Sequence, residues 1–130
     1  MSEEVLEEEV ESVPTILDDV KKMIGPSEIY DHFNTDLIIH INSVFNILQQ
    51  MGVGPEEGFS ITADGKETWD DYIEGIENKN IFQMVKSYMY LKVRMQFDPP
   101  TGSVLTYFQE QIKEYEWRLN AASETKWSKT

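Results

Sequence analysis

The stretch NIFQMVKSYMYLKVRMQF, residues 80–97, has apolar or aromatic side chains at 11 of the 17 positions that follow Asn80. These side chains are distributed nearly all round a helical wheel, and a helix that is apolar on nearly all sides is buried at the centre of a fold. Asn80 is a suitable N-cap, and the pattern ends before Pro99 and Pro100 because proline cannot donate a backbone hydrogen bond to a helix. We therefore expect a central helix that ends at Phe97.

The clearest amphipathic pattern lies upstream of this helix, beginning at Asn34 or Thr35 and ending at Gly52. Its apolar side chains recur at steps of three and four residues, which places them on one face of a helix. The residues of this face are Leu37, Ile38, Ile41, Val44, Phe45, Leu48 and Met51.

Two further helices are expected, one at each end of the domain. Thr15 is a suitable N-cap for a short helix that ends at Gly25 and Pro26 and carries Ile16, Leu17, Val20, Met23 and Ile24. Ser103 is a suitable N-cap for the last helix, whose apolar positions are Leu105, Phe108, Ile112, Tyr115 and Leu119.

Residues 53–79 lose the helical period and contain four glycines, one proline and eight acidic residues against two lysines, which is typical of a loop. Within this loop, residues 59–66 are compatible with a small hairpin, and Thr68 is a suitable cap for one helical turn that carries Trp69 and Tyr72. The expected fold class is therefore all-α, a compact bundle of about four helices with an irregular acidic loop between the second and third.

The chain has 130 residues, which fits one domain, and a formal net charge of −13. We place the helical domain at residues 14–120. Residues 1–13 precede it as an acidic tail with six glutamates and no basic residue, which we expect to be disordered, and residues 121–130 follow it as a flexible tail. The charge has the wrong sign for tracking a DNA backbone, and no apolar run approaches the length that spans a membrane.

Residues that would support catalysis or metal binding are few. The chain has no cysteine, which excludes disulfides and thiolate chemistry. The histidines, His32 and His40, lie eight residues apart with no His-x-x-x-His pair, so Asp31 and Asp36 beside them do not complete a metal motif. We expect no catalytic residue, no metal and no cofactor.

The acidic loop holds more apolar residues than a connection needs, and we interpret four of them as a candidate partner interface: Phe59, Ile61, Trp69 and Tyr72. Charge is also segregated, because residues 80–97 hold three basic residues and no acid. Opposite patches on different sides favour association of copies into rings or filaments. The competing interpretation, that these charges are simply solvated, has equal weight.

Four stretches, taken in order, resemble a known family: residues 36–42 (DLIIHIN), 51–59 (MGVGPEEGF), 90–100 (YLKVRMQFDPP) and 111–120 (QIKEYEWRLN). Together they are similar to the head-tail connector, or adaptor, proteins of long-tailed phages and prophages, especially those of Gram-positive hosts. The resemblance covers about residues 15–120, and none of the four stretches is a catalytic signature.

The resemblance implies a small helical subunit without catalytic activity, located in the virion after assembly in the host cytoplasm. Such subunits form a ring beneath the portal after DNA packaging, extend its channel, and offer a platform for further head-completion and tail proteins. The genome would pass without specific binding, because an acidic lining repels phosphates. The resemblance also adds the turn at Asp98, Pro99 and Pro100 to the candidate interface.

Two alternatives use the same composition. The first is an acidic helical protein that inhibits a nucleic-acid enzyme by imitating DNA charge, although six of the 24 acids lie in a tail and eight in an irregular loop. The second is a small enzyme that holds a divalent ion with Asp70, Asp71 and Glu74, for which no metal-ligand spacing exists.

Removal of residues 2–13 should leave the helical fold intact, because the predicted packing lies downstream of them. Thermal unfolding followed by circular dichroism should remain cooperative in the shortened chain. Loss of the cooperative transition would contradict this domain boundary.

Overall fold

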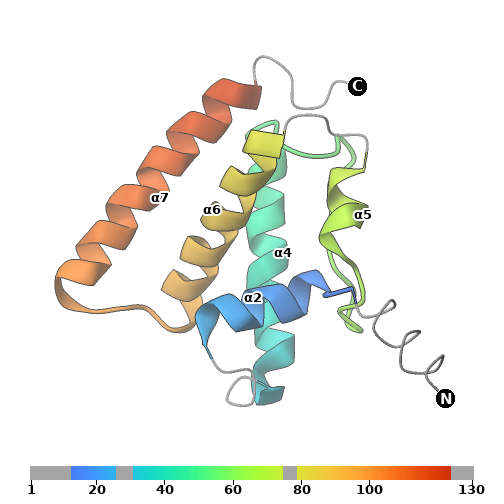
Figure 1. Ribbon diagram of the computed structural model, residues 1–130, viewed down its shortest axis with the longest axis horizontal. Coiled ribbons are helices and arrows are strands. Elements are labelled where there is room, and N and C mark those ends of the chain that lie inside the picture. The colour runs from blue at the N-terminus through green and yellow to red at the C-terminus, as the bar shows by residue number, and fades with distance from the viewer. Residues whose placement is uncertain (1–12, 26–30, 75–78, 124–130) are drawn as a thin grey trace, which may run out of the picture.

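The computed structural model describes residues 13–25, 31–74 and 79–123, and its regular elements there are all helical. In chain order they are α2 (Ile16–Ile24), the 3-10 turn η1 (Asp31–Phe33), α4 (Asn34–Gln50), α5 (Trp69–Ile73), α6 (Lys79–Phe97) and α7 (Gly102–Ser123). Figure 1 shows α4 and α6 in the middle, α2 crossing them near one end, and α5 and α7 on opposite sides. The predicted all-α class is confirmed.

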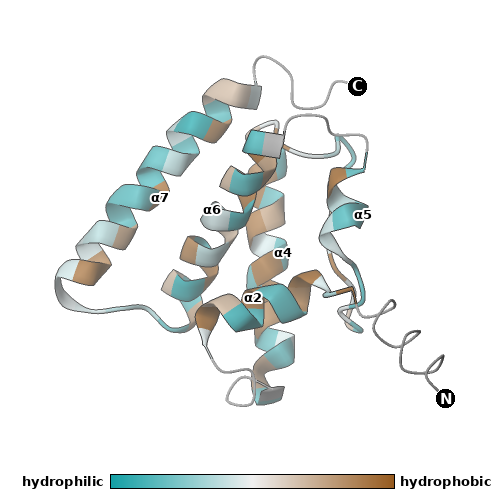
Figure 2. Ribbon diagram, in the orientation of Figure 1, coloured by the Kyte–Doolittle hydropathy of each residue, from teal (hydrophilic) through white to brown (hydrophobic). Residues whose placement is uncertain are grey.

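Helix α6 occupies the centre, as its apolar pattern predicts, and packs against α2, α4 and α7. It contributes six buried side chains to the core: Ile81, Val85, Tyr88, Met89, Leu91 and Val93. Hydrophobic colour also follows α4 where it lies behind α6 (Figure 2). The helix begins at Lys79, so Asn80 lies inside its first turn instead of capping it.

The start of α2 and the end of α4 are marked by the residues that the sequence predicts. The Thr15 hydroxyl caps α2 by accepting a hydrogen bond from the Asp18 backbone N–H at 3.0 Å. Helix α4 stops at Gly52, whose φ of +85° is the left-handed conformation that glycine adopts without strain. The next residue, Val53, then turns back and donates its N–H to the Leu48 carbonyl at 2.8 Å.

The acidic loop folds back onto the bundle and supplies part of the core. Val53, Ile61, Trp69 and Tyr72 belong to the same buried cluster as the helices. The Asn42 side chain of α4 holds the loop, because its Oδ1 accepts from the Ile61 N–H at 2.8 Å and its Nδ2 donates to the Ile61 carbonyl at 3.0 Å. The loop is therefore packed structure, despite its loss of periodicity.

The predicted hairpin at residues 59–66 does not form. These residues make a turn closed by the Gly65 N–H on the Thr62 carbonyl at 2.8 Å, and the nearby backbone pairing is an isolated bridge between Thr15 and Thr68. The physical reason is the Asn42 side chain, which occupies both backbone groups of Ile61 that a partner strand would need.

The single turn predicted after Thr68 is confirmed as α5. The Thr68 hydroxyl accepts from the Asp71 N–H, and the Asp71 carboxylate accepts in return from the Thr68 N–H at 2.9 Å, which is a capping box. Close packing against this turn requires Gly54 to lack a side chain, because a Cβ there would meet the Tyr72 hydroxyl at 2.6 Å.

Helix α7 begins at Gly102, one residue before the predicted cap Ser103, and continues to Ser123, three residues past the predicted end at Asn120. Its buried side chains are Phe108 and Leu119, both from the predicted apolar stripe. The predictions for the acidic tail at residues 1–12 and for residues 124–130 of the C-terminal tail fall outside the described residues.

Asn42→Ala should lower the free energy of unfolding by about 1–3 kcal/mol, because two backbone groups of Ile61 lose their hydrogen-bond partner. Asn46→Ala, an exposed position one turn along the same helix, should change it by less than about 0.5 kcal/mol. Urea unfolding of the two variants measures the difference. Equal stabilities would show that Asn42 does not hold the loop.

Candidate functional site

The described residues contain no group of three or more histidine, aspartate or glutamate side chains placed to hold a metal ion. His40 packs edge-on against Phe97 with ring centroids 6.4 Å apart, and His32 is exposed. Asp71 is used in the cap of α5. In the described part of the chain no helix has the length and apolarity needed to cross a membrane.

The four loop residues predicted as an interface point into the protein's own core. The exposed fractions of Ile61, Trp69 and Tyr72 are 3%, 8% and 1%, and Phe59 is half-buried. Phe45 of α4 is the centre of this cluster, with ring centroids 5.0 Å from both Phe59 and Tyr72.

The predicted interface requires these side chains to be exposed, whereas in the single chain Ile61, Trp69 and Tyr72 are buried. Tertiary packing buries them, and the Trp69 indole N–H donates to the Asp19 carboxylate at 2.9 Å. They act as core residues in the single chain.

The other predicted residues, Asp98, Pro99 and Pro100, lie in an accessible turn between α6 and α7, with Asp98 and Pro99 exposed. Arg94 holds this turn by donating from Nε to the Asp98 carbonyl at 2.8 Å. Phe33 packs against Phe97 beside it, with centroids 5.4 Å apart, and remains 42% exposed. We call Phe33 and residues 98–100 the proline-turn surface.

Helix α7 carries large exposed side chains that were not predicted as site residues. Val104, Tyr107 and Trp117 are 48%, 57% and 71% exposed. They fall outside the apolar stripe from Leu105 to Leu119, and this mismatch is the sequence signal that would have found them. We call Val104 and Trp117 the α7 outer surface, whereas Tyr107 lines the groove between α6 and α7.

The exposed side of α4 is almost uncharged. It carries one formal charge, at Asp36, and an isoleucine, Ile39, that is 59% exposed. The other exposed residues of this side are Thr35, Ser43, Asn46, Gln49 and Gln50. Loss of charge on an exposed face is typical of the core of a protein interface.

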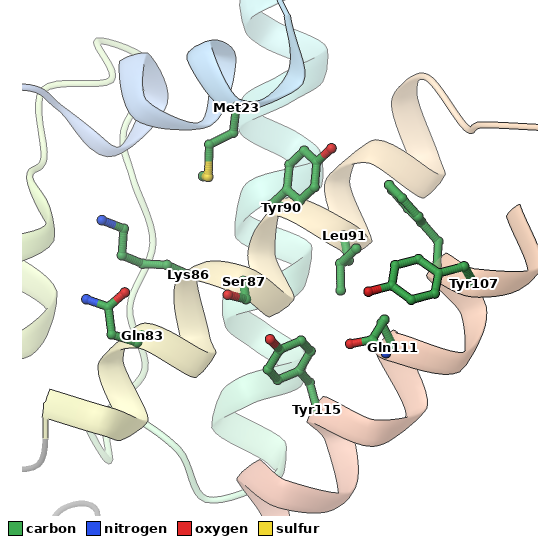
Figure 3. Close-up of a pocket in the computed structure, with 10 residues that line it drawn as sticks. Met23, Gln83, Lys86, Ser87, Tyr90, Leu91, Tyr107, Gln111 and Tyr115 are labelled. Atoms are coloured by element: carbon green, nitrogen blue, oxygen red, sulfur yellow. The ribbon is translucent and has the colours of Figure 1, made fainter. Parts of the chain in front are cut away.

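A groove of about 410 Å³ lies between α6 and α7 and reaches the end of α2 (Figure 3). Tyr107 and Tyr115 project from α7 towards α6, with Gln111 between them. The full lining is Met23, Gln83, Lys86, Ser87, Tyr90, Leu91, Tyr107, Phe108, Gln111 and Tyr115, which includes no acidic residue. We call this concavity the α6–α7 groove.

A hydrogen bond and an ion pair connect α6 to α7 and hold the two helices at the spacing of the groove. The buried Tyr88 hydroxyl of α6 donates to the Glu116 carboxylate of α7 at 2.8 Å, and the Lys92 ammonium lies 4.0 Å from the same carboxylate. Burial, followed by the hydrogen bond to Glu116, raises the pKa of Tyr88, and burial also raises the pKa of Tyr72. Both phenols therefore stay protonated over the physiological range, and the Tyr88 phenol donates to Glu116.

These features define a class of protein: a small, helical, acidic subunit whose accessible features are contact surfaces. The family described as "Phage connector protein" matches residues 16–126. The chain belongs to the phage connector protein family, a family of structural proteins, and its general role is that of a phage structural connector. No curated protein and no solved structure matches it.

The match confirms the resemblance found in the four sequence stretches. It begins at Ile16 and therefore does not include the acidic residues 1–12. Those residues are an addition to the part of the chain that the family describes.

The free energy of unfolding should fall as pH rises above about 10, the pKa of tyrosine in an unfolded chain. Above this pH the unfolded state loses phenol protons that buried Tyr88 and Tyr72 retain, so the folded state binds more protons. Each tyrosine contributes a slope of about −0.7 kcal/mol per pH unit at pH 10, which steepens towards about −1.4 at higher pH.

Urea unfolding between about pH 9 and pH 11 measures this slope around the tyrosine pKa. In Tyr88→Phe the slope should be shallower by one tyrosine's contribution, whereas Tyr107→Phe, at an exposed position, should keep the original slope. Identical slopes in both variants would mean that Tyr88 titrates normally in the folded protein.

Proposed function

We propose that this protein is a non-enzymatic head-tail connector subunit that forms a ring on the portal and links the DNA-filled capsid to the tail. Its partners are further copies of itself, the portal protein, and later head-completion or tail proteins. It resides at the head-tail interface of the virion, after assembly in the host cytoplasm. Family membership supports the general role, and the surfaces of the described residues support the assembly.

The observation that carries ring formation is that the exposed large apolar side chains of the helices, with Val13 before α2 and Tyr107 in the α6–α7 groove left aside, lie in two groups. One group is the α7 outer surface, and the other is Phe33 and Ile39 on η1 and α4. Helix α6 lies between the helices that bear them, since it packs against both α4 and α7. A ring with head-to-tail contacts needs two different surfaces on each subunit, whereas a two-fold dimer needs one.

Charge explains which surfaces are able to meet. Copies that each carry a net charge of −13 repel one another, and contact is favourable only where little charge has to be brought together. The nearly uncharged exposed side of α4 meets this condition, because Asp36 is its one formal charge. This side of α4 also carries the exposed Ile39, which an apolar residue of a neighbouring copy would bury.

The proline-turn surface is the candidate contact for the portal or a tail protein. Its prolines restrict the backbone, so little conformational entropy is lost when a partner binds. The strongly negative charge of the whole chain supports passage of DNA without binding, because phosphates and carboxylates repel.

An acidic inhibitor that imitates DNA is the alternative function, and the geometry of the carboxylates gives it less support. Several of them accept hydrogen bonds within the chain: Asp19 from Trp69, Glu67 from the Thr62 N–H, and Asp71 from the Thr68 N–H. A DNA mimic requires carboxylates presented outward in a regular array.

Native mass spectrometry over a range of concentrations, with the protein alone and mixed with the portal assembly of the same phage, tests the proposal. We expect a closed ring, or many copies bound to one portal assembly. A persistent monomer without portal is compatible with templated assembly. A monomer that also ignores the portal would overturn the connector proposal and favour the inhibitor.

Trp117→Ser should weaken the self-association or portal-bound assembly by about tenfold or more, because a tryptophan at an interface centre typically contributes about 2 kcal/mol or more. Thr106→Ala, an exposed position on the same helix, is the matched control and should assemble normally. Unchanged assembly of Trp117→Ser would remove the α7 outer surface from the interface.

A further inference from the structure

The exposed side of α4 contains a regular row of side chains. Its positions recur at steps of three and four residues, which places them on one face of the helix, opposite the face that packs in the core. The members of this α4 row are Asp36, Ile39, Ser43, Asn46 and Gln50, all of them exposed. Asp36 is the formal charge of the row and Ile39 is its large apolar side chain, one turn further along.

Helix α7 has a comparable row on the side away from its buried residues Phe108 and Leu119. The members of this α7 row are Glu110, Lys113, Trp117 and Ala121, again at steps of three and four residues and all exposed. Trp117 is its large apolar side chain, with 71% of its surface accessible. Lys113 lies one turn before Trp117, as Asp36 lies one turn before Ile39.

The two rows carry unpaired charges of opposite sign. Ion pairs within the subunit hold the other basic side chains that are described on α6 and α7, namely Lys86, Lys92, Arg94 and Arg118. Among the described residues, neither the Lys113 ammonium nor the Asp36 carboxylate has an ion-pair partner. Each charge is therefore available to a group on another molecule, beside an apolar side chain that is also uncovered.

The directions of α4 and α7 allow both pairs of side chains to meet at once. Figure 1 shows the two helices running the same way through the molecule, with α6 packed against both. A small rotation between neighbours in a ring keeps α4 of one copy roughly parallel to α7 of the next. From the charge to the apolar side chain the distance along the axis is about 4.5 Å in α4 and about 6 Å in α7. Parallel packing thus brings Lys113 to Asp36 and Trp117 to Ile39 together.

This register also avoids contact between carboxylates. Glu110, the acid of the α7 row, lies one turn before Lys113, and the matching position one turn before Asp36 precedes the start of α4 at Asn34. A two-fold contact between two α4 rows would instead place two Asp36 carboxylates in one interface without a cation of either row. Charge therefore favours the α7 row over a second α4 row as the partner.

We propose that the α4 row of one copy packs against the α7 row of the next copy, with Asp36 paired to Lys113 and Ile39 covered by Trp117. The inference rests on the proposed ring and specifies the contact between its subunits. Each copy carries both rows, so the same contact repeats from copy to copy until the ring closes. Burial of the apolar pair supplies the attraction, and the ion pair fixes the register of the two helices.

Charge reversal tests the pairing of Asp36 with Lys113. Asp36→Lys or Lys113→Glu alone replaces an attraction by a repulsion, and each should raise the concentration needed for self-association or portal-bound assembly by about tenfold. The double variant restores opposite charges and should return this concentration to within about threefold of the natural chain. Native mass spectrometry over a range of concentrations measures it.

The matched control for the change in net charge is Lys66→Glu, at an exposed position in the acidic loop, which should assemble normally. Asp36 also lies in the first turn of α4, where a carboxylate stabilises the helix. This stabilisation is lost equally in Asp36→Lys and in the double variant. Recovery of assembly in the double variant therefore reports the contact between copies.

Disulfide cross-linking tests the register, because the natural chain has no cysteine. Ser43 and Ala121 lie four residues after Ile39 and Trp117, so the parallel contact brings these two positions together. Ser43→Cys and mass-labelled Ala121→Cys chains are mixed, assembled on the portal and oxidised mildly. The bond between residues 43 and 121 should form about tenfold more than either bond between identical chains, since packed positions have a high effective concentration. Thr106→Cys, earlier on α7, replaces Ala121→Cys as the control.

The remaining outcomes separate this contact from the connector proposal. Assemblies that form normally with either charge reversed, that fail to recover in the double variant, or that lack the bond between residues 43 and 121 would overturn the contact and leave the connector proposal in place. A predominance of bonds between two residues 43 or two residues 121 would replace it by a two-fold contact. A natural chain that neither self-associates nor binds the portal would overturn both.

Discussion

Burial of helix α6 on several sides is the constraint on which the rest of this structure depends. A helix with apolar residues nearly all round has no stable position at a surface, so other elements have to cover it. Helices α2, α4 and α7 do so, each through its own apolar side. The remaining faces of these helices stay outside, and they are the surfaces from which contacts with other proteins have to be built.

The acidic loop shows how tertiary packing changes the meaning of a sequence pattern. Apolar residues in an aperiodic, glycine-containing stretch suggest an exposed interface when only the local sequence is considered. In the folded protein Phe45 collects the aromatic rings of Phe59 and Tyr72, and Asn42 fixes the backbone of Ile61. Most of the described acidic residues of this stretch are exposed, while Val53, Ile61, Trp69 and Tyr72 complete the core, so one segment serves both stability and surface charge.

Much of the fold could be predicted from local signals: the period of α4, the Thr15 and Thr68 caps, and the glycine that ends α4. The burial of Trp69 could not, because it depends on α6 and on Asp19, which lies 50 residues away in the sequence. Family membership could be anticipated from four stretches in order, yet the surfaces could not. The exposure of Trp117 could not be predicted, because in the sequence it is one of several aromatic residues on a helix. The acid-free groove could not be predicted either, because it exists only once α6 and α7 are placed together.

Helix α7 is attached along one seam, since its buried side chains are Phe108 and Leu119 and its packing is mainly against α6. Burial of two such side chains stabilises its docking by about 3–6 kcal/mol, less than the stability of most whole domains. The angle of α7 relative to α2 and α4 therefore depends on this one seam with α6. In an assembly of identical subunits, a small change of angle at this seam would be repeated in every copy, so the curvature of the whole assembly would be set by many small changes.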